Sequence, residues 1–141
     1  MKYVLDASVA LRWVLPHPLA PHALRLRDEY QQKIHELVSP NIFLDEVASA
    51  LTKAERQKTI PVGQAAPLYV KVMNTPPVLL PHFPLVSRAI DISSQTRSSF
   101  YDCLYVALAE REACELVTAD DKLIRNLQAR FPFIAHLSSL P

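Results

Sequence analysis

Four carboxylates of this chain occupy positions where an unpaired charge is costly to bury. Asp6 directly follows the short apolar run of residues 2–5, and Asp120 comes two residues after a similar run. Glu46 lies on the apolar stripe of an amphipathic segment, and Asp102 is the one acid of an almost wholly apolar run. Since the strands of a parallel sheet present functional groups beyond their carboxyl ends, we expect Asp6 and Asp120 at one sheet edge.

Gathered carboxylates repel one another, so one or more must stay protonated unless a cation neutralises them. Oxygen ligands of this kind suit Mg²⁺ or Mn²⁺, hard ions that often bind substrate phosphate. Such an ion supplies an activated water and stabilises charge on a phosphoryl oxygen. The chain has a single glycine, which excludes the glycine-rich loops that cradle a nucleotide. The phosphate is therefore expected to belong to a polynucleotide backbone.

Each acid also has a purely structural interpretation. Asp6 and Asp120 can act as helix N-caps, and Asp102, three residues after Ser99, fits a variant of the capping box. Glu46 can be solvated at the edge of its stripe. Capping explains neither Glu46 nor a convergence of the acids at one end of a sheet, so the set as a whole favours a functional cluster.

The elements that would position these acids alternate along the chain as short apolar strands and helices. Strands are expected over residues 2–5, 36–39, 78–80, 116–118 and 133–137. Helices are expected over residues 7–15, 20–34, 41–58, from Pro61 with a kink or restart at Pro67, 85–93, 100–112 and 121–129. This alternation predicts an α/β fold with a mainly parallel sheet covered on both faces, in a single domain over residues 1–141.

With these elements in place, the sequence resembles the PIN-domain ribonucleases, and most of all the small VapC-type toxins of bacterial and archaeal type II toxin–antitoxin pairs. Four segments carry the resemblance in the family's order and spacing. They are Val4–Ser8, Glu46–Leu51, Tyr101–Ala109 and Leu116–Asp120. One departure is the absence of the glycine that the family often has before the later strand, where this chain has Ala113-Cys114-Glu115.

The resemblance implies a three-layer α/β/α PIN-like fold with an acidic site that binds Mg²⁺ or Mn²⁺. It makes Asp6, Glu46, Asp102 and Asp120 the acidic quartet, with Ser8 and Thr118 as nearby hydroxyl positions. Asp6 and Asp102 would hold the principal metal, and the other two acids would bind through water or complete a second site. Because Asp121 follows Asp120 directly, the fourth acid stays open between them, and the position after the threonine favours Asp120.

The activity that the resemblance implies is metal-dependent cleavage of RNA phosphodiester bonds, leaving a 5′-phosphate and a 3′-hydroxyl. Members of this toxin class usually form homodimers and are blocked by a cognate antitoxin protein. A second class stays open, a catalytically inactive PIN-like or receiver-like scaffold that binds a partner without cleaving. Retention of four acids and both hydroxyls favours the nuclease, because a binding module has no need for buried charge.

Composition and charge bear on the expected partner and on the compartment in which the protein acts. The net charge of +1 argues neither for nor against nucleic acid, although Lys53, Arg56, Lys58, Lys122, Arg125 and Arg130 are candidate phosphate contacts or, equally, parts of solvated helix faces. The longest charge-free stretch, residues 72–87, is short and contains four prolines, so no membrane span is expected. Because the carboxylate of Asp6 comes after only three apolar residues, we expect no secretory leader at the start, and the two cysteines lead us to expect a reducing cytoplasm.

Overall fold

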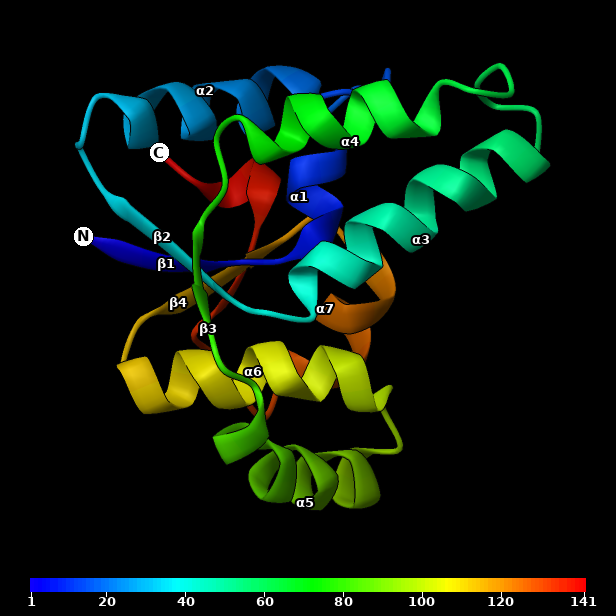
Figure 1. The fold of residues 1–141 in the computed structure, drawn as a ribbon. Helices are drawn as coiled ribbons and strands as arrows, with labels where there is room; N and C mark the ends of the chain where they lie inside the picture. Colours follow the sequence, from blue (N-terminus) through cyan, green and yellow to red (C-terminus); the bar gives the residue numbers. More distant parts are fainter.

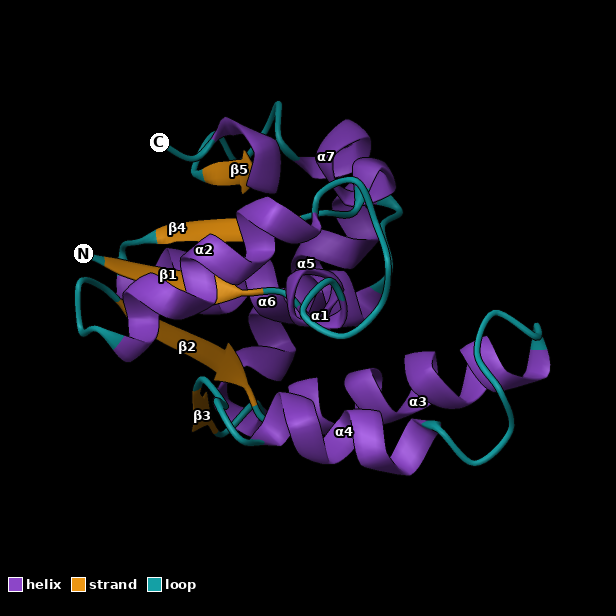
Figure 2. Ribbon diagram, turned by 90° about the horizontal axis from the view of Figure 1, so that it is seen from above, coloured by secondary structure: helices purple, strands orange, loops and turns teal.

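The computed structural model describes residues 1–141, and its central layer is a five-stranded sheet (Figure 1). The strands are β1 (Lys2–Leu5), β2 (Glu36–Pro40), β3 (Val78–Leu80), β4 (Glu115–Thr118) and β5 (Ile134–His136). They are ordered β3-β2-β1-β4-β5, as Figure 2 shows, and every neighbouring pair is parallel. The chain moves outward from β1 to β3 and then returns to the other side of β1. The boundary between β1 and β4 is therefore the switch point where ligands bind in open α/β sheets.

Seven helices cover the two faces of this sheet. They are α1 (Ala7–Leu11), α2 (Ala20–Gln31), α3 (Phe43–Arg56), α4 (Ala65–Met73), α5 (Val86–Thr96), α6 (Phe100–Glu112) and α7 (Asp121–Leu127). Tyr3 and Leu5 pack with α1 to α4, whereas Val4 between them packs on the opposite face with α5 to α7. This arrangement confirms the predicted three-layer α/β/α fold.

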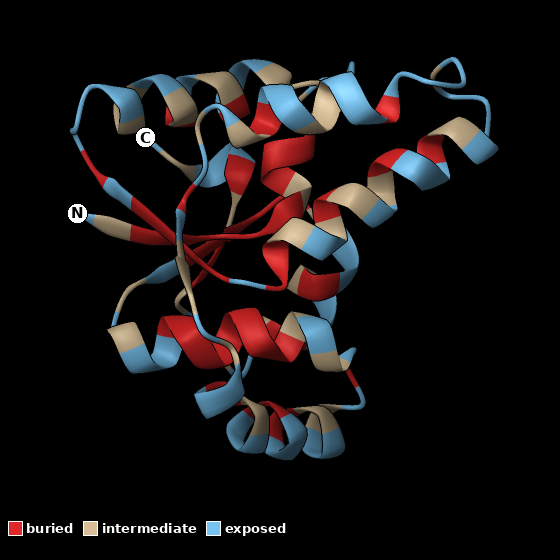
Figure 3. Cartoon of the chain, in the orientation of Figure 1, coloured by how far each residue is buried: buried red, intermediate tan, exposed pale blue.

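Helix α6 lies between the sheet and α5, and this position explains its composition. Every residue from Cys103 to Ala109 is buried, the continuous buried stretch that Figure 3 shows along this helix. A helix covered on both sides is apolar all round. It starts at the edge where the strands end and runs back to the start of β4, so its first turn, with Asp102, lies at the carboxyl edge of the sheet.

Several element boundaries differ from the prediction. Helix α1 ends at Leu11, and residues 12–15 form turns ahead of Pro16 instead of extending it. The helix expected from Pro61 begins only at Ala65, after a turn in which Gly63 has a φ of +93°. Pro67 then falls in the first turn of α4, where its missing N–H has no intrahelical partner to lose, so it does not kink the helix.

Four helices end in residues with left-handed backbone conformation although none of these residues is glycine. They are Lys33, Lys58, Arg97 and Ala113, which follow α2, α3, α5 and α6. Ala113, with φ 52° and ψ 47°, occupies the place where the resemblance leads one to expect glycine. The turn is therefore kept with alanine, at the steric cost of a Cβ in this conformation.

None of the helices is both long and apolar enough to cross a lipid bilayer.

Candidate functional site

The fold brings Asp6 and Thr118 together across the switch point. Asp6 ends β1, and its Oδ2 accepts hydrogen bonds from Ser8 Oγ (2.5 Å) and Thr118 Oγ1 (2.8 Å). The Asp6 side chain makes no capping hydrogen bond to α1, which it precedes. The capping interpretation therefore fails for Asp6, and the two predicted hydroxyl positions are its partners.

Both hydroxyl groups are fixed by the backbone of the strand on the other side of the switch point. Ser8 Oγ accepts from the Ala119 N–H (2.9 Å), and Thr118 Oγ1 accepts from the Asp120 N–H (3.0 Å). Since each hydroxyl already accepts from an amide, its proton is directed to Asp6. This network holds one oxygen of the Asp6 carboxylate in place and leaves Oδ1 as the oxygen that can reach a ligand.

Asp120 caps α7 and also faces the other acids. Its Oδ1 accepts from the N–H groups of Lys122 (2.9 Å) and Leu123 (3.3 Å), so the capping interpretation is correct for this residue. Its charge nevertheless raises the pKa of Asp6, Glu46 and Asp102. Asp120 therefore has a structural role and lies among the acids.

Asp121 lies differently from Asp120. Its side chain is 80% exposed, and its Oδ1 lies 3.2 Å from the Nε2 of His136. Of the two candidates for the fourth acid, Asp120 is thus the one that the fold places with the others.

Glu46 and Asp102 complete the group from the first turns of α3 and α6. Burial, together with the carboxylates of Asp6, Asp120 and Glu46, raises the pKa of Asp102 to about 7. Burial likewise raises the pKa of Glu46 to about 7, with a contribution from Asp6 and Asp120. The cation that acts in the opposite direction on Asp102 is Lys122, at the start of α7. The structure therefore brings all four predicted acids into one electrostatic cluster.

The donor set of this cluster suits a hard divalent cation. One oxygen of Glu46, Oε1, is buried without any hydrogen-bond partner, and the acids outnumber their cationic neighbours. A bound cation would remove both the unpartnered oxygen and the repulsion. The arrangement is nevertheless open, since no three carboxylate, histidine or cysteine side chains are close enough to enclose an ion. Binding therefore requires the side chains to draw together.

Tyr105 lies beside the acidic cluster, and the sequence analysis did not identify it. Its ring is fully buried in α6, its hydroxyl has no regular hydrogen bond, and its pKa is raised well above the ordinary value by burial and by Asp6 and Glu46. The hydroxyl lies beside Glu46 and lowers the pKa of that carboxyl, although the two groups do not have ordinary hydrogen-bond geometry. A tyrosine three residues after Asp102 in a buried helix, which needs a partner for its hydroxyl, is the signal that could have revealed it.

Comparison with known proteins identifies the family and supports the fold. A family model of the PIN domain matches residues 3–127. No curated protein sequence matches the chain. The crystal structure of PAE2754 from Pyrobaculum aerophilum is similar with a TM-score of 0.73 and 22% sequence identity, over 99% of this chain and 94% of that one. VapBC2 from Rickettsia felis, bound to a DNA fragment from its promoter, is similar with a TM-score of 0.67 and 14% identity, over 96% of this chain and 98% of that one. At these identities the two structures support the fold alone.

Proposed function

The chain belongs to the PIN domain family, and from this we propose that it is a Mg²⁺- or Mn²⁺-dependent endoribonuclease, the toxin component of a toxin–antitoxin pair. The observation that carries the proposal is the cluster of Asp6, Glu46, Asp102 and Asp120, in which the pKa of both Glu46 and Asp102 is raised to about 7. A structural role accounts for one of the four, Asp120, and leaves the charge of the others unexplained.

Asp6 and Asp102 are the residues that would hold the principal ion, with Glu46 and Asp120 binding through water or completing a second site. When bound, the ion supplies an activated water and stabilises negative charge on a phosphoryl oxygen. Asp6 presents a fixed carboxylate because Ser8 and Thr118 restrain one of its oxygens. Four ionised carboxylates repel a phosphodiester, so their neutralisation lets the backbone of an RNA strand approach this edge.

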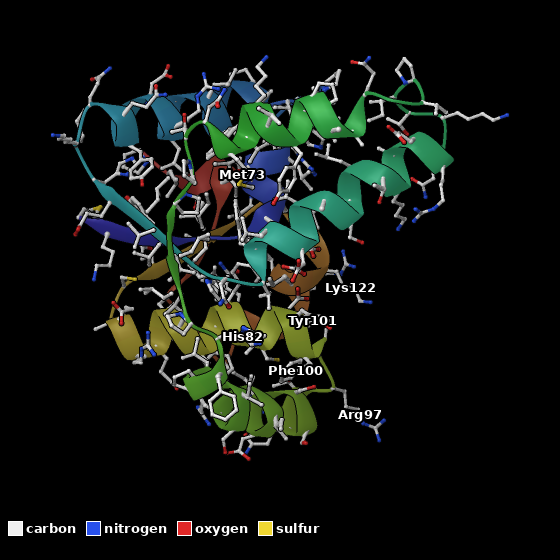
Figure 4. All side chains as sticks on the ribbon, viewed as in Figure 1. Met73, His82, Arg97, Phe100, Tyr101 and Lys122 are labelled. Carbon is white, nitrogen blue, oxygen red and sulfur yellow. The ribbon has the colours of Figure 1, made fainter.

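Lys122 extends the site toward the substrate. Its side chain is exposed at the start of α7, beside Asp102, and Figure 4 shows it at the edge of the molecule where the strands end. An exposed ammonium in this position suits a backbone phosphate, which positions a nucleic acid without reading its sequence. The wider assignment follows the family: one domain over residues 1–141, a homodimer in the cytoplasm, and a cognate antitoxin as partner.

A binding scaffold is the second candidate, and the open arrangement of the carboxylates is the observation that favours it. The two are separated by incubating mixed RNA with protein freed of any co-purifying partner, in Mg²⁺ or Mn²⁺ and in EDTA. The nuclease predicts cleavage that needs the metal and is lost in Asp102→Asn but kept in Glu112→Gln, a carboxylate at the opposite sheet edge. Cleavage that persists in Asp102→Asn would place the activity elsewhere, and well-folded wild type that binds Mn²⁺ without cleaving would favour the scaffold.

A further inference from the structure

A pocket of about 650 Å³ opens beside the carboxylates, between the start of α3, the start of α6 and His82. Glu46 belongs to both the pocket wall and the acidic cluster, so the two are continuous. In Figure 4, His82, Phe100 and Tyr101 lie close together next to the start of α3. The volume falls in the range of pockets that hold a small ligand or one unit of a polymer.

One side of the pocket is aromatic. Tyr101 is 53% exposed although it is a large side chain on an ordered helix. Phe100 beside it is partly buried and packs on the core, and the two rings meet edge to face with centroids 5.7 Å apart. Phe100 therefore restrains the neighbouring ring, and about half of Tyr101 is left exposed as an aromatic surface beside the pocket. Such a surface stacks well on a planar, unpaired base.

The opposite side carries polar groups on one face of α3. Asp45 and Lys53 are exposed and lie eight residues apart, about two turns along the helix. The Lys53 ammonium suits a phosphate, and the Asp45 carboxylate can accept hydrogen bonds from the amino group of a base. A nucleotide needs both kinds of partner in addition to an aromatic surface.

His82 adds a fixed nitrogen to the pocket wall. Asn41 Oδ1 accepts from the backbone N–H of His82 (3.2 Å), which identifies this atom as the amide oxygen. The ring Nδ1 lies 2.5 Å from the same oxygen and therefore carries the proton of that hydrogen bond. The pair holds the imidazole in one orientation and leaves Nε2 for an incoming base edge.

We propose that this pocket binds one unpaired nucleotide of an RNA strand whose neighbouring phosphate lies at the acidic cluster. The proposal rests on the proposed function for the identity of the strand. Its base stacks on Tyr101, its phosphate contacts Lys53, and its edge faces Asp45 and His82. In a duplex each base is stacked and paired within the helix, so only a single-stranded segment or a loop can enter.

The test measures binding of a fluorescent 12-nucleotide single-stranded RNA of mixed sequence by anisotropy, in EDTA, where metal-dependent cleavage cannot occur. Tyr101→Ala should weaken binding about five- to hundredfold, the range that losing one stacked base usually costs. Tyr101→Phe, which keeps the ring, should bind within about twofold of wild type. Lys53→Ala should weaken binding and reduce the slope of log affinity against log salt by about 1.

Matched controls separate the pocket from general surface effects. Phe83→Ala removes an aromatic ring that is 83% exposed and outside the pocket, and Lys71→Ala removes an exposed cation of α4. Both should bind like wild type, and a duplex of the same sequence should bind wild type and Tyr101→Ala equally. Equal binding of the single strand by wild type and Tyr101→Ala would overturn the proposal. Wild type that binds no single strand in EDTA, and none in Mn²⁺, where a bound cation offsets the repulsion from the acids, would do the same.

Cleavage in Mn²⁺ by the same proteins distinguishes this proposal from the proposed function. If wild type does not cleave but its single-strand binding depends on Tyr101, the nuclease assignment fails and the nucleotide pocket stands. If wild type cleaves and Tyr101→Ala binds and cleaves equally well, the pocket fails and the nuclease assignment stands.

Discussion

At the edge of the sheet where the strands begin, a carboxylate lies between two cations, whereas at the opposite edge four carboxylates lie together. Glu112 Oε1 is 3.1 Å from Lys2 Nζ, and its Oε2 is 3.2 Å from Arg111 Nε. The hydrogen bond from Lys2 lowers the pKa of Glu112, with Arg111 acting in the same direction. At the other edge, burial and like charges raise the pKa of Glu46 and Asp102 to about 7.

The contrast shows that the acidic cluster is not the result of a shortage of cations. The chain has 15 Lys and Arg residues for 14 Asp and Glu residues, enough to pair each acid. It pairs a partly exposed acid, Glu112, and leaves the clustered acids at the other edge, whose pKa burial raises, without enough cations to offset their repulsion. Sequences break such local rules chiefly at functional sites, which is how we interpret the carboxyl edge.

The largest difference between the two edges should appear in activity. Asp6→Asn removes the charge that Ser8 and Thr118 hold in place, and we expect RNA cleavage in Mn²⁺ to fall about a thousandfold or more. Glu112→Gln, the same kind of change at the paired edge, should leave the rate within about twofold. Equal rates for the two variants would contradict the functional distinction between the edges.

The second largest difference between the two edges should appear in the stabilisation of the protein by Mn²⁺. A cation that binds the folded state at about 100 times its dissociation constant adds about 2.7 kcal/mol to the free energy of unfolding. For a domain of this size that raises the melting temperature by roughly 5–10 °C. We expect Mn²⁺ to produce such a shift in wild type and Glu112→Gln but not in Asp102→Asn. A shift retained by Asp102→Asn would move the metal away from the cluster.

In EDTA, the pH dependence of the melting temperature should reflect the raised pKa values of Glu46 and Asp102. Glu46 and Asp102 have a pKa of about 7 when folded, above their ordinary values of 4.5 and 3.8, so the folded state binds more protons between those limits. The contribution of these two groups to the free energy of unfolding is therefore greatest at low pH and is lost as the pH rises through 7. The melting temperature of wild type should drop by several degrees from pH 5 to pH 8. Asp102→Asn should show a smaller drop in melting temperature. A wild-type melting temperature that does not change between pH 5 and pH 8 would contradict the raised pKa values of the clustered acids.

Tyr105→Phe should have a smaller and more selective effect. It removes a buried hydroxyl that lowers the pKa of Glu46 but keeps the ring that fills the core. We expect the melting temperature to change by about 2 °C at most, and the pH at which Mn²⁺ binding is half-complete to move upward. A normal pH profile of Mn²⁺ binding would show that Tyr105 only fills space.

The smallest effect should come from the paired edge itself. The Lys2–Glu112 pair lies at the surface with both side chains partly exposed, so Glu112→Gln should shift the melting temperature by about 1–2 °C at most. High salt should remove even this difference, because it screens exposed pairs. A larger loss of stability would mean that the Lys2–Glu112 pair contributes more to the free energy of unfolding than a surface ion pair usually does.

The fold and the identity of the clustered acids were predictable, because both follow from patterns along the chain. The alternation of short apolar runs with helical spacing predicted the parallel sheet, and the positions of Asp6 and Asp120 after strands predicted their convergence. The start of α4 was not predictable, since Pro61 is as good a first-turn residue as Pro67 until the turn at Gly63 is known. The hydrogen bonds of Ser8 and Thr118 and the position of Tyr105 depend on contacts between distant segments, which no local pattern encodes.

The left-handed helix ends at Lys33, Lys58, Arg97 and Ala113 also bear on how this sequence can change. At each position a glycine would relieve on the order of 1 kcal/mol of backbone strain, partly offset by the greater freedom of glycine in the unfolded chain. A chain with one glycine therefore holds a reserve of stabilising substitutions, none of them among the acidic residues or the pocket wall. Directed evolution of substrate preference could use this reserve, introducing one such glycine for each destabilising change made at the site.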